Sequence, residues 1–135
     1  MARKAVSWIL EFASNLPKKE MIKCLRENEL AVKTVLQYAY DPNIKWLLPK
    51  GDVPYEPCKF DNQDGILYAE LRRLYLFVEG GNPNLTQLKR ESIFIDIIEN
   101  VTPEDAILLV NIKDKKLPHP KVTSKIVLEA FPGLY

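Results

Sequence analysis

Apolar residues recur along most of this chain with the spacing of amphipathic helices. Residues 3–14 carry four of them at positions i, i+3, i+4 and i+7, which share one helical face: Val6, Ile9, Leu10 and Ala13. Trp8 and Phe12 widen this stripe. The pattern predicts a helix here that buries a broad apolar face.

The same reasoning predicts helices over about 18–26, 29–40, 65–79 and 85–100. In them we expect these inward positions: Met21, Ile22 and Leu25; Leu30, Ala31, Val35, Leu36 and Ala39; Leu67, Leu71, Leu74 and Val78; Leu88, Ile95, Ile98 and Val101. The helix over 85–100 also carries Ile93, Phe94 and Ile97, so it is apolar on more than one side, which favours a central place.

Local backbone signals mark several helix ends. Asn28 precedes the third helix as an N-cap, and the glycines at 80 and 81 follow the fourth. Thr102, with proline next and then two acids, predicts the start of a sixth helix. Thr123 predicts the cap of a short seventh helix that ends before Pro132.

Residues 42–64 contain four prolines and a glycine, which exclude a long helix. Trp46, Leu47, Tyr55 and Phe60 have apolar surface to bury, so we expect an ordered crossing loop in which 44–48 is a short extended piece. There is no internal repeat, and strand-like alternation is scarce. The sequence therefore predicts one all-α domain over 1–135, a compact bundle of about seven helices.

Composition narrows the class of protein. The hydrophobic content of 47% and charged content of 27% are those of a globular domain, and no apolar run is long enough to span a membrane. Cys24 and Cys58 stand alone, which favours reduced thiols. Glycine-rich phosphate loops, HExxH and GxSxG are missing, and the lone His119 reads as a surface loop residue. We expect neither catalysis nor a metal or other cofactor.

Positive charge gathers at the two ends of the chain although the net charge is only +1. Residues 1–26 hold six Lys or Arg against two Glu, and residues 113–125 hold five Lys against one Asp. If the fold brings these ends together, they form one anion-binding face. Solvated helix faces are the ordinary alternative.

The stretch from Ile112 to Tyr135 concentrates these signals. A helix capped by Thr123 leaves backbone amides free for a phosphate, and lysines surround that position. The candidate DNA-binding residues are Lys113, Lys115, Lys116, Lys121, Thr123, Ser124 and Lys125. The alternative is that the lysines only complement the negative C-terminal end of the preceding helix.

Two segments resemble a known family. The opening ILEFASNLPKKEMIKCLRENELAVKTVLQYAYDPNIKW looks like that of the all-helical N-terminal DNA-binding domain of phage ATP-dependent DNA ligases, with its ILxEIAS helix and NxxLxxVLxxAYDP motif. The end resembles that domain too, with Lys113-Asp114, the LPHPK turn, a short helix and the step FPGL at 131–134. The chain is also similar to small uncharacterised proteins of large tailed myoviruses, including cyanophages.

The resemblance implies a non-catalytic viral protein of the host cytoplasm that grips duplex DNA, nicked or replicating, through backbone phosphates. The ligase adenylation motif KxDG is absent, so the resemblance does not extend to ligation. The loop at 117–121 is rich in proline where those domains have glycine. The second hypothesis is a protein adaptor that has lost DNA binding and binds a phage replication or host protein. A structural virion protein is a third possibility.

Overall fold

The computed structural model describes residues 4–135, and these form seven α-helices and one 3-10 helix. The helices are α1 (Val6–Ser14), α2 (Lys18–Glu27), α3 (Glu29–Tyr40), α4 (Ile66–Glu70), η1 (Leu71–Phe77), α5 (Gln87–Asn100), α6 (Pro103–Lys113) and α7 (Ser124–Ala130). The all-α prediction is confirmed. The predicted helix at 65–79 is divided between α4 and η1, and the predicted start of the first helix at Arg3 lies outside the described residues.

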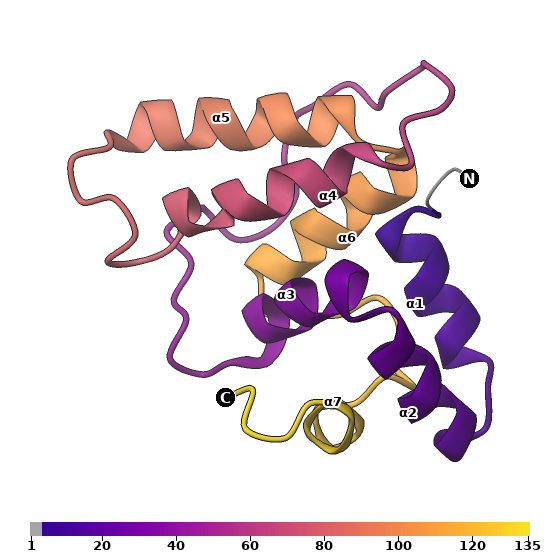
Figure 1. Cartoon of the computed structure of the whole chain (residues 1–135). Coiled ribbons are helices and arrows are strands. Elements are labelled where there is room, and N and C mark those ends of the chain that lie inside the picture. The colour runs from indigo at the N-terminus through magenta and orange to yellow at the C-terminus, as the bar shows by residue number, and fades with distance from the viewer. Residues whose placement is uncertain (1–3) are drawn as a thin grey trace.

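The helix α6 lies at the centre of the bundle. It packs against α1, α3 and α5, whereas α5 packs against α6 and η1 at one side (Figure 1). The expectation that the helix over 85–100 is central is therefore wrong. The buried side chains of α6 explain its place, because together they cover a broad face of about half of the helix: Asp105, Ala106, Leu108, Leu109, Ile112 and Lys113.

Threonine hydroxyls begin three of the helices, two of them as predicted. Thr102 accepts the amide of Asp105 at 3.0 Å, and Thr123 accepts that of Ile126 at 3.3 Å. Thr86 caps α5 in the same way. Asn28 occupies the N-cap position of α3 but does not cap it, because its amide nitrogen donates backwards to the Cys24 carbonyl at 2.8 Å.

The cap of α1 comes from another helix. Ala5 stands at the N-cap position and offers no side-chain acceptor. Instead, Asp105 is fully buried and its Oδ1 accepts the Ser7 amide at 2.8 Å. A carboxylate at this end of a helix meets free amides and the positive end of the dipole. Asp105 thus joins α6 to α1.

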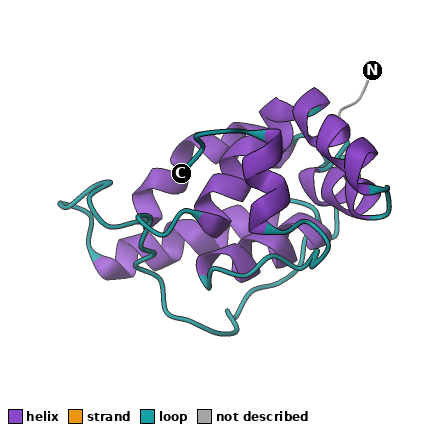
Figure 2. Ribbon diagram, turned by 90° about the horizontal axis from the view of Figure 1, so that it is seen from below, coloured by secondary structure: helices purple, strands orange, loops and turns teal. Residues whose placement is uncertain are grey.

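The proline-rich segment crosses the molecule as a loop between α3 and α4, as predicted (Figure 1), and Figure 2 shows in teal the loops that join the helices. Trp46 forms an antiparallel bridge with Val78, and the Leu47 amide donates to the Phe77 carbonyl at 2.8 Å. The Trp46 ring stacks on Phe77 at 6.5 Å between centroids. One aromatic residue of the segment contradicts the prediction, because Phe60 remains 77% exposed.

Other residues that were expected in the core lie at the surface. Leu30 is 82% exposed and Leu88 is 83% exposed. Trp8 and Phe12 are only half-buried, so the face of α1 that is buried is narrower than predicted. His119 shows the opposite error: it is buried, and its Nδ1 lies 2.9 Å from Oε2 of Glu11.

Candidate nucleic-acid interface

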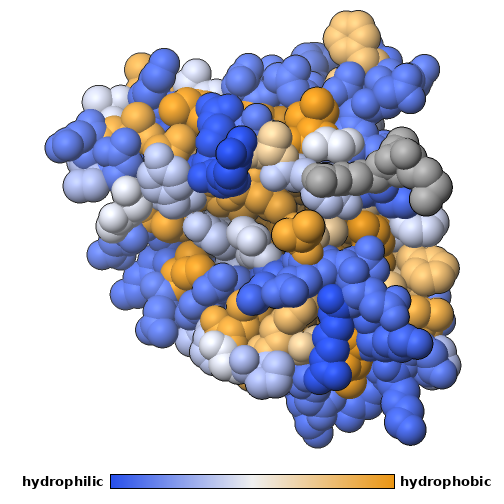
Figure 3. Space-filling model, viewed as in Figure 1, coloured by the Kyte–Doolittle hydropathy of each residue, from blue (hydrophilic) through white to orange (hydrophobic). Residues whose placement is uncertain are grey.

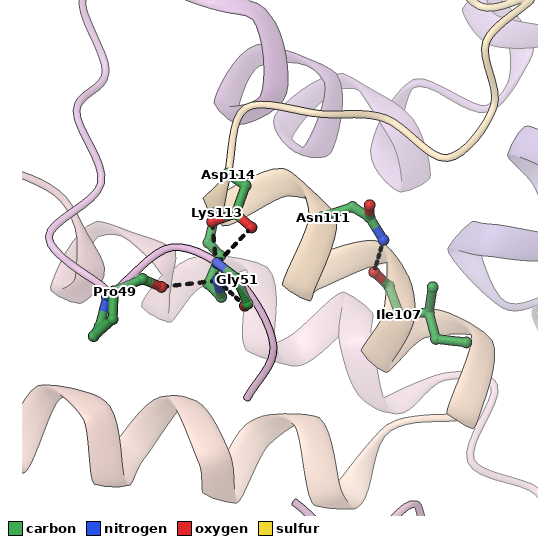
Figure 4. Close-up of polar contacts among 6 residues, drawn as sticks. All are labelled: Pro49, Gly51, Ile107, Asn111, Lys113 and Asp114. Atoms are coloured by element: carbon green, nitrogen blue, oxygen red, sulfur yellow. Dashed lines mark hydrogen bonds and ion pairs between the residues drawn. The ribbon is translucent and has the colours of Figure 1, made fainter. Parts of the chain in front are cut away.

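The predicted cluster of lysines divides into two groups, and Lys113 belongs to the buried one. Its Nζ donates to the carbonyls of Pro49 at 2.8 Å and Gly51 at 2.7 Å, and to Oδ1 of Asp114 at 2.9 Å (Figure 4). The side chain has no exposed surface. These three acceptors match the three protons of an ammonium group, so Lys113 fastens the proline-rich loop to the end of α6 and does not face solvent.

Asp114 completes this attachment from the other side. Its Oδ2 accepts the Gly51 amide at 3.0 Å. Burial alone would raise the pKa of the Asp114 carboxyl, but the Gly51 amide and the Lys113 ammonium outweigh it and hold the pKa below its ordinary value. The Asp114 carboxyl is therefore ionised at neutral pH, and it accepts a hydrogen bond from each of these two groups.

Lys115 is also engaged inside the molecule. Its backbone is left-handed, with φ of 61°, and the amides of Lys115 and Lys116 donate to the carbonyls of Ile112 and Asn111. This is the Schellman end of α6, with lysine where glycine is usual. The ammonium of Lys115 then reaches the end of α3.

The Lys115 Nζ donates to the carbonyls of Asp41 at 2.7 Å and Tyr38 at 3.0 Å. Partial burial lowers the pKa of this ammonium, which Asp41 opposes. The expected alternative, a lysine that complements a helix C-terminus, thus describes Lys115, although the helix is α3 and not the preceding α6.

The remaining three predicted lysines, Lys116, Lys121 and Lys125, are exposed. Both hydroxyl residues beside them have partners. The Thr123 hydroxyl caps α7 by accepting the Ile126 amide, and the Ser124 hydroxyl is hydrogen-bonded to the Tyr135 hydroxyl. The charge that this segment offers to a ligand therefore comes from three lysines, and neither hydroxyl is free of a partner.

Helix α2 packs directly against α7, so the basic N-terminal segment lies beside the helix that carries Lys125 (Figure 1). Nζ of Lys18 lies 3.3 Å from Oε2 of Glu129, one turn along α7 from Lys125. The Arg26 guanidinium donates to the carbonyls of Ala130 at 3.0 Å and Glu129 at 2.8 Å, which closes the C-terminal end of α7. The two basic segments thus meet, as the sequence pattern allowed.

We call the following exposed lysines the basic face: Lys18, Lys19 and Lys23 of α2, Lys125 of α7, and Lys121, which lies three residues before α7. Lys116, which follows the end of α6, is not counted in it. Three acids stand among them: Glu20, Glu27 and Glu129. Only Lys18 and Lys23 pair with any of these, Lys23 with Glu27 at a loose 3.9 Å. The uncompensated charge of the face is positive.

The described residues contain no group of three or more His, Cys, Asp or Glu that could hold a metal ion. Over the same residues, no helix has the length and apolar character needed to cross a membrane. Both thiols, Cys24 and Cys58, are free.

Comparison with known proteins assigns the chain to a family. The model of a family of unknown function, DUF6433, matches residues 9–119, and the chain belongs to this family. No curated protein matches the chain, and no solved structure does so either. The matched residues include α2 but end before α7, so only part of the basic face lies within them.

Proposed function

We propose that this protein binds duplex DNA without catalysis and without sequence specificity, through contacts of the basic face with backbone phosphates. The observation that supports the proposal best is the packing of α2 against α7, which joins two basic segments that lie about a hundred residues apart in sequence. The resemblance to phage ligase DNA-binding domains supports the same function, in a viral protein of the host cytoplasm that acts at nicked or replicating duplex.

Lysines suit this role because each acts as a flexible point charge that needs no fixed orientation. Lys19, Lys121 and Lys125 have no ion-pair partner in the described part of the chain, so they are available to phosphates. The net charge of +1 means that the rest of the surface contributes little attraction. Binding should therefore depend on this face and on salt, with a log-log slope of about −3 if three or four phosphates are neutralised.

The test is fluorescence anisotropy on nicked, intact and single-stranded DNA over a salt series. The triple variant Lys19→Glu, Lys121→Glu, Lys125→Glu reverses the three unpaired charges of the basic face. Its matched control carries the same change at three exposed lysines elsewhere: Lys45, Lys59 and Lys89. We expect the first variant to lose at least about tenfold in affinity and most of the salt slope, and the control to lose much less.

A folded wild-type protein that binds none of these DNAs at low salt would contradict the proposal. Equal losses in the two triple variants would show that net charge acts, and not the basic face. Lys113 and Lys115 are unsuitable for charge reversal, because their ammonium groups are hydrogen-bonded inside the molecule.

A further inference from the structure

Helix α1 exposes two aromatic rings to solvent. Trp8 is 49% exposed and Phe12 is 50% exposed, and their rings stack with centroids 5.4 Å apart. The Lys4 ammonium lies 4.9 Å from the centroid of the Trp8 ring. Large aromatic side chains left open to water in a stacked pair are typical of binding surfaces, because they offer apolar area at little cost in side-chain entropy.

A groove of about 800 Å³ runs beside these rings, between α1 and the junction of α2 with α3. Leu30, which is 82% exposed, lies on its other wall. Trp8 also borders a second hollow of about 540 Å³, together with Ile107, which is 51% exposed. Figure 3 shows apolar atoms reaching the surface at the right-hand edge, where α1 lies in Figure 1. We call Trp8, Phe12, Leu30 and Ile107 the docking strip.

The charge beside the docking strip is negative. Three acids line the second hollow, Glu11, Asp64 and Glu104, and no lysine or arginine does. Glu11 is hydrogen-bonded to His119, whereas Asp64 and Glu104 form no ion pair within residues 4–135. In the groove, by contrast, basic and acidic residues are mixed, and Nζ of Lys23 lies 3.9 Å from Oε1 of Glu27.

We propose that the docking strip binds an amphipathic helix of a partner protein, with an apolar stripe bordered by lysine or arginine. Trp8 and Phe12 stand at i and i+4, so their spacing along α1 equals the spacing of apolar residues on an approaching helix. Basic residues beside that stripe would meet Asp64 and Glu104, which have no ion-pair partner among residues 4–135. A second copy of this chain fits less well, because a two-fold contact places the same acidic surroundings on both sides.

This interaction is separate from DNA binding. Of the basic face, only Lys23 also lines the groove, and its charge is paired with Glu27. The protein would therefore hold a partner helix and DNA on neighbouring surfaces, so that the adaptor role does not require loss of the DNA-binding role. Either interaction can fail in experiment without affecting the other.

The probe is a synthetic helical peptide of about five turns with leucine on one face and lysine elsewhere, beside a matched peptide in which glutamate replaces lysine. Isothermal titration calorimetry measures both against the wild-type protein. We expect the lysine peptide to bind at least about tenfold more tightly than the glutamate peptide. The double variant Asp64→Asn, Glu104→Gln should remove most of that difference.

The apolar anchors are tested by the double variant Trp8→Ala, Phe12→Ala, with Phe60→Ala, Leu88→Ala as the control, because both control residues are exposed and lie outside the two hollows. The first variant should lose at least about tenfold in affinity for the lysine peptide, and the control should match the wild type. Circular dichroism establishes that both variants are folded.

Cys24 gives a second measurement that needs no variant. It lines the groove and Cys58 does not, so saturating lysine peptide should slow alkylation of Cys24 several-fold and leave Cys58 unchanged. Equal affinity for the two peptides, unchanged affinity in the Trp8→Ala, Phe12→Ala variant, or no protection of Cys24 would overturn the proposal. So would a wild-type dimer in sedimentation equilibrium that this variant dissociates, because the strip would then bind a second copy.

Discussion

Replacement of Lys113 by methionine tests whether this lysine belongs to the fold. Methionine has nearly the same length and keeps the apolar contacts of the side chain, but it removes a charge and three hydrogen bonds. Breaking a buried ion pair costs about 3–5 kcal/mol, because the remaining partner is left uncompensated. Here Asp114 keeps its bond from the Gly51 amide, and the exposed loop lets water reach the two carbonyls. We therefore expect the lower end, about 3 kcal/mol.

Urea unfolding followed by circular dichroism measures this loss, which in a domain of this size lowers Tm by roughly 10 °C. The matched control is Lys116→Met, which makes the same substitution at an exposed lysine three residues away and should change stability by less than about 0.5 kcal/mol. Similar unfolding free energies for the two variants would refute the assignment of Lys113 as an internal attachment. Under conditions where the Lys113→Met variant is folded, its DNA affinity should equal that of the wild type.

Two further substitutions test the other internal charges. Burial raises the pKa of the Asp105 carboxyl above its ordinary 3.8, so the folded state binds this proton more tightly than the unfolded state does. The stability that protonation adds is fully present below pH 3.8 and is lost as the pH rises through the raised pKa. Asp105→Asn keeps an acceptor for the Ser7 amide but has no carboxyl to titrate. Its unfolding free energy relative to the wild type, measured by urea titration, should therefore increase as the pH rises over this range. A difference in unfolding free energy that does not change with pH would contradict the pKa shift. Lys115→Ala loses both bonds to the end of α3 and should cost about 1–2 kcal/mol. Lys115→Gly loses the same bonds but relieves the left-handed backbone, so it should be about 1 kcal/mol more stable than the alanine variant in thermal unfolding, and the reverse order would refute this account.

Features set by near neighbours in sequence were predicted well. The caps by Thr102 and Thr123 and the break at the proline-rich loop depend on residues within a few positions, where backbone preferences act directly. Helical periodicity also placed most of the core. It failed at Leu30 and Leu88, because periodicity shows which residues share a face but not whether another element covers the edge of that face.

Buried charges were beyond sequence reasoning for a different reason. Two of the three acceptors of Lys113 are backbone carbonyls more than sixty residues away, and backbone carbonyls have no signature in sequence. The same holds for Asp105, whose partner amide lies 98 residues away, and for the burial of His119 against Glu11. The sequence therefore predicted more lysines in the binding site of this segment than the fold leaves exposed. The sequence left open whether the two basic ends meet, and the packing of α2 against α7 shows that they do.

The most direct test of the proposed function compares two triple charge reversals in one anisotropy titration on nicked duplex DNA. We predict that Lys19→Glu, Lys121→Glu, Lys125→Glu lowers affinity at least about tenfold and flattens the salt dependence, whereas the same change at Lys45, Lys59 and Lys89 largely preserves both. Equal affinities for the two variants, or no binding by the folded wild type at low salt, would contradict the assignment of the α2–α7 surface as a DNA-binding face.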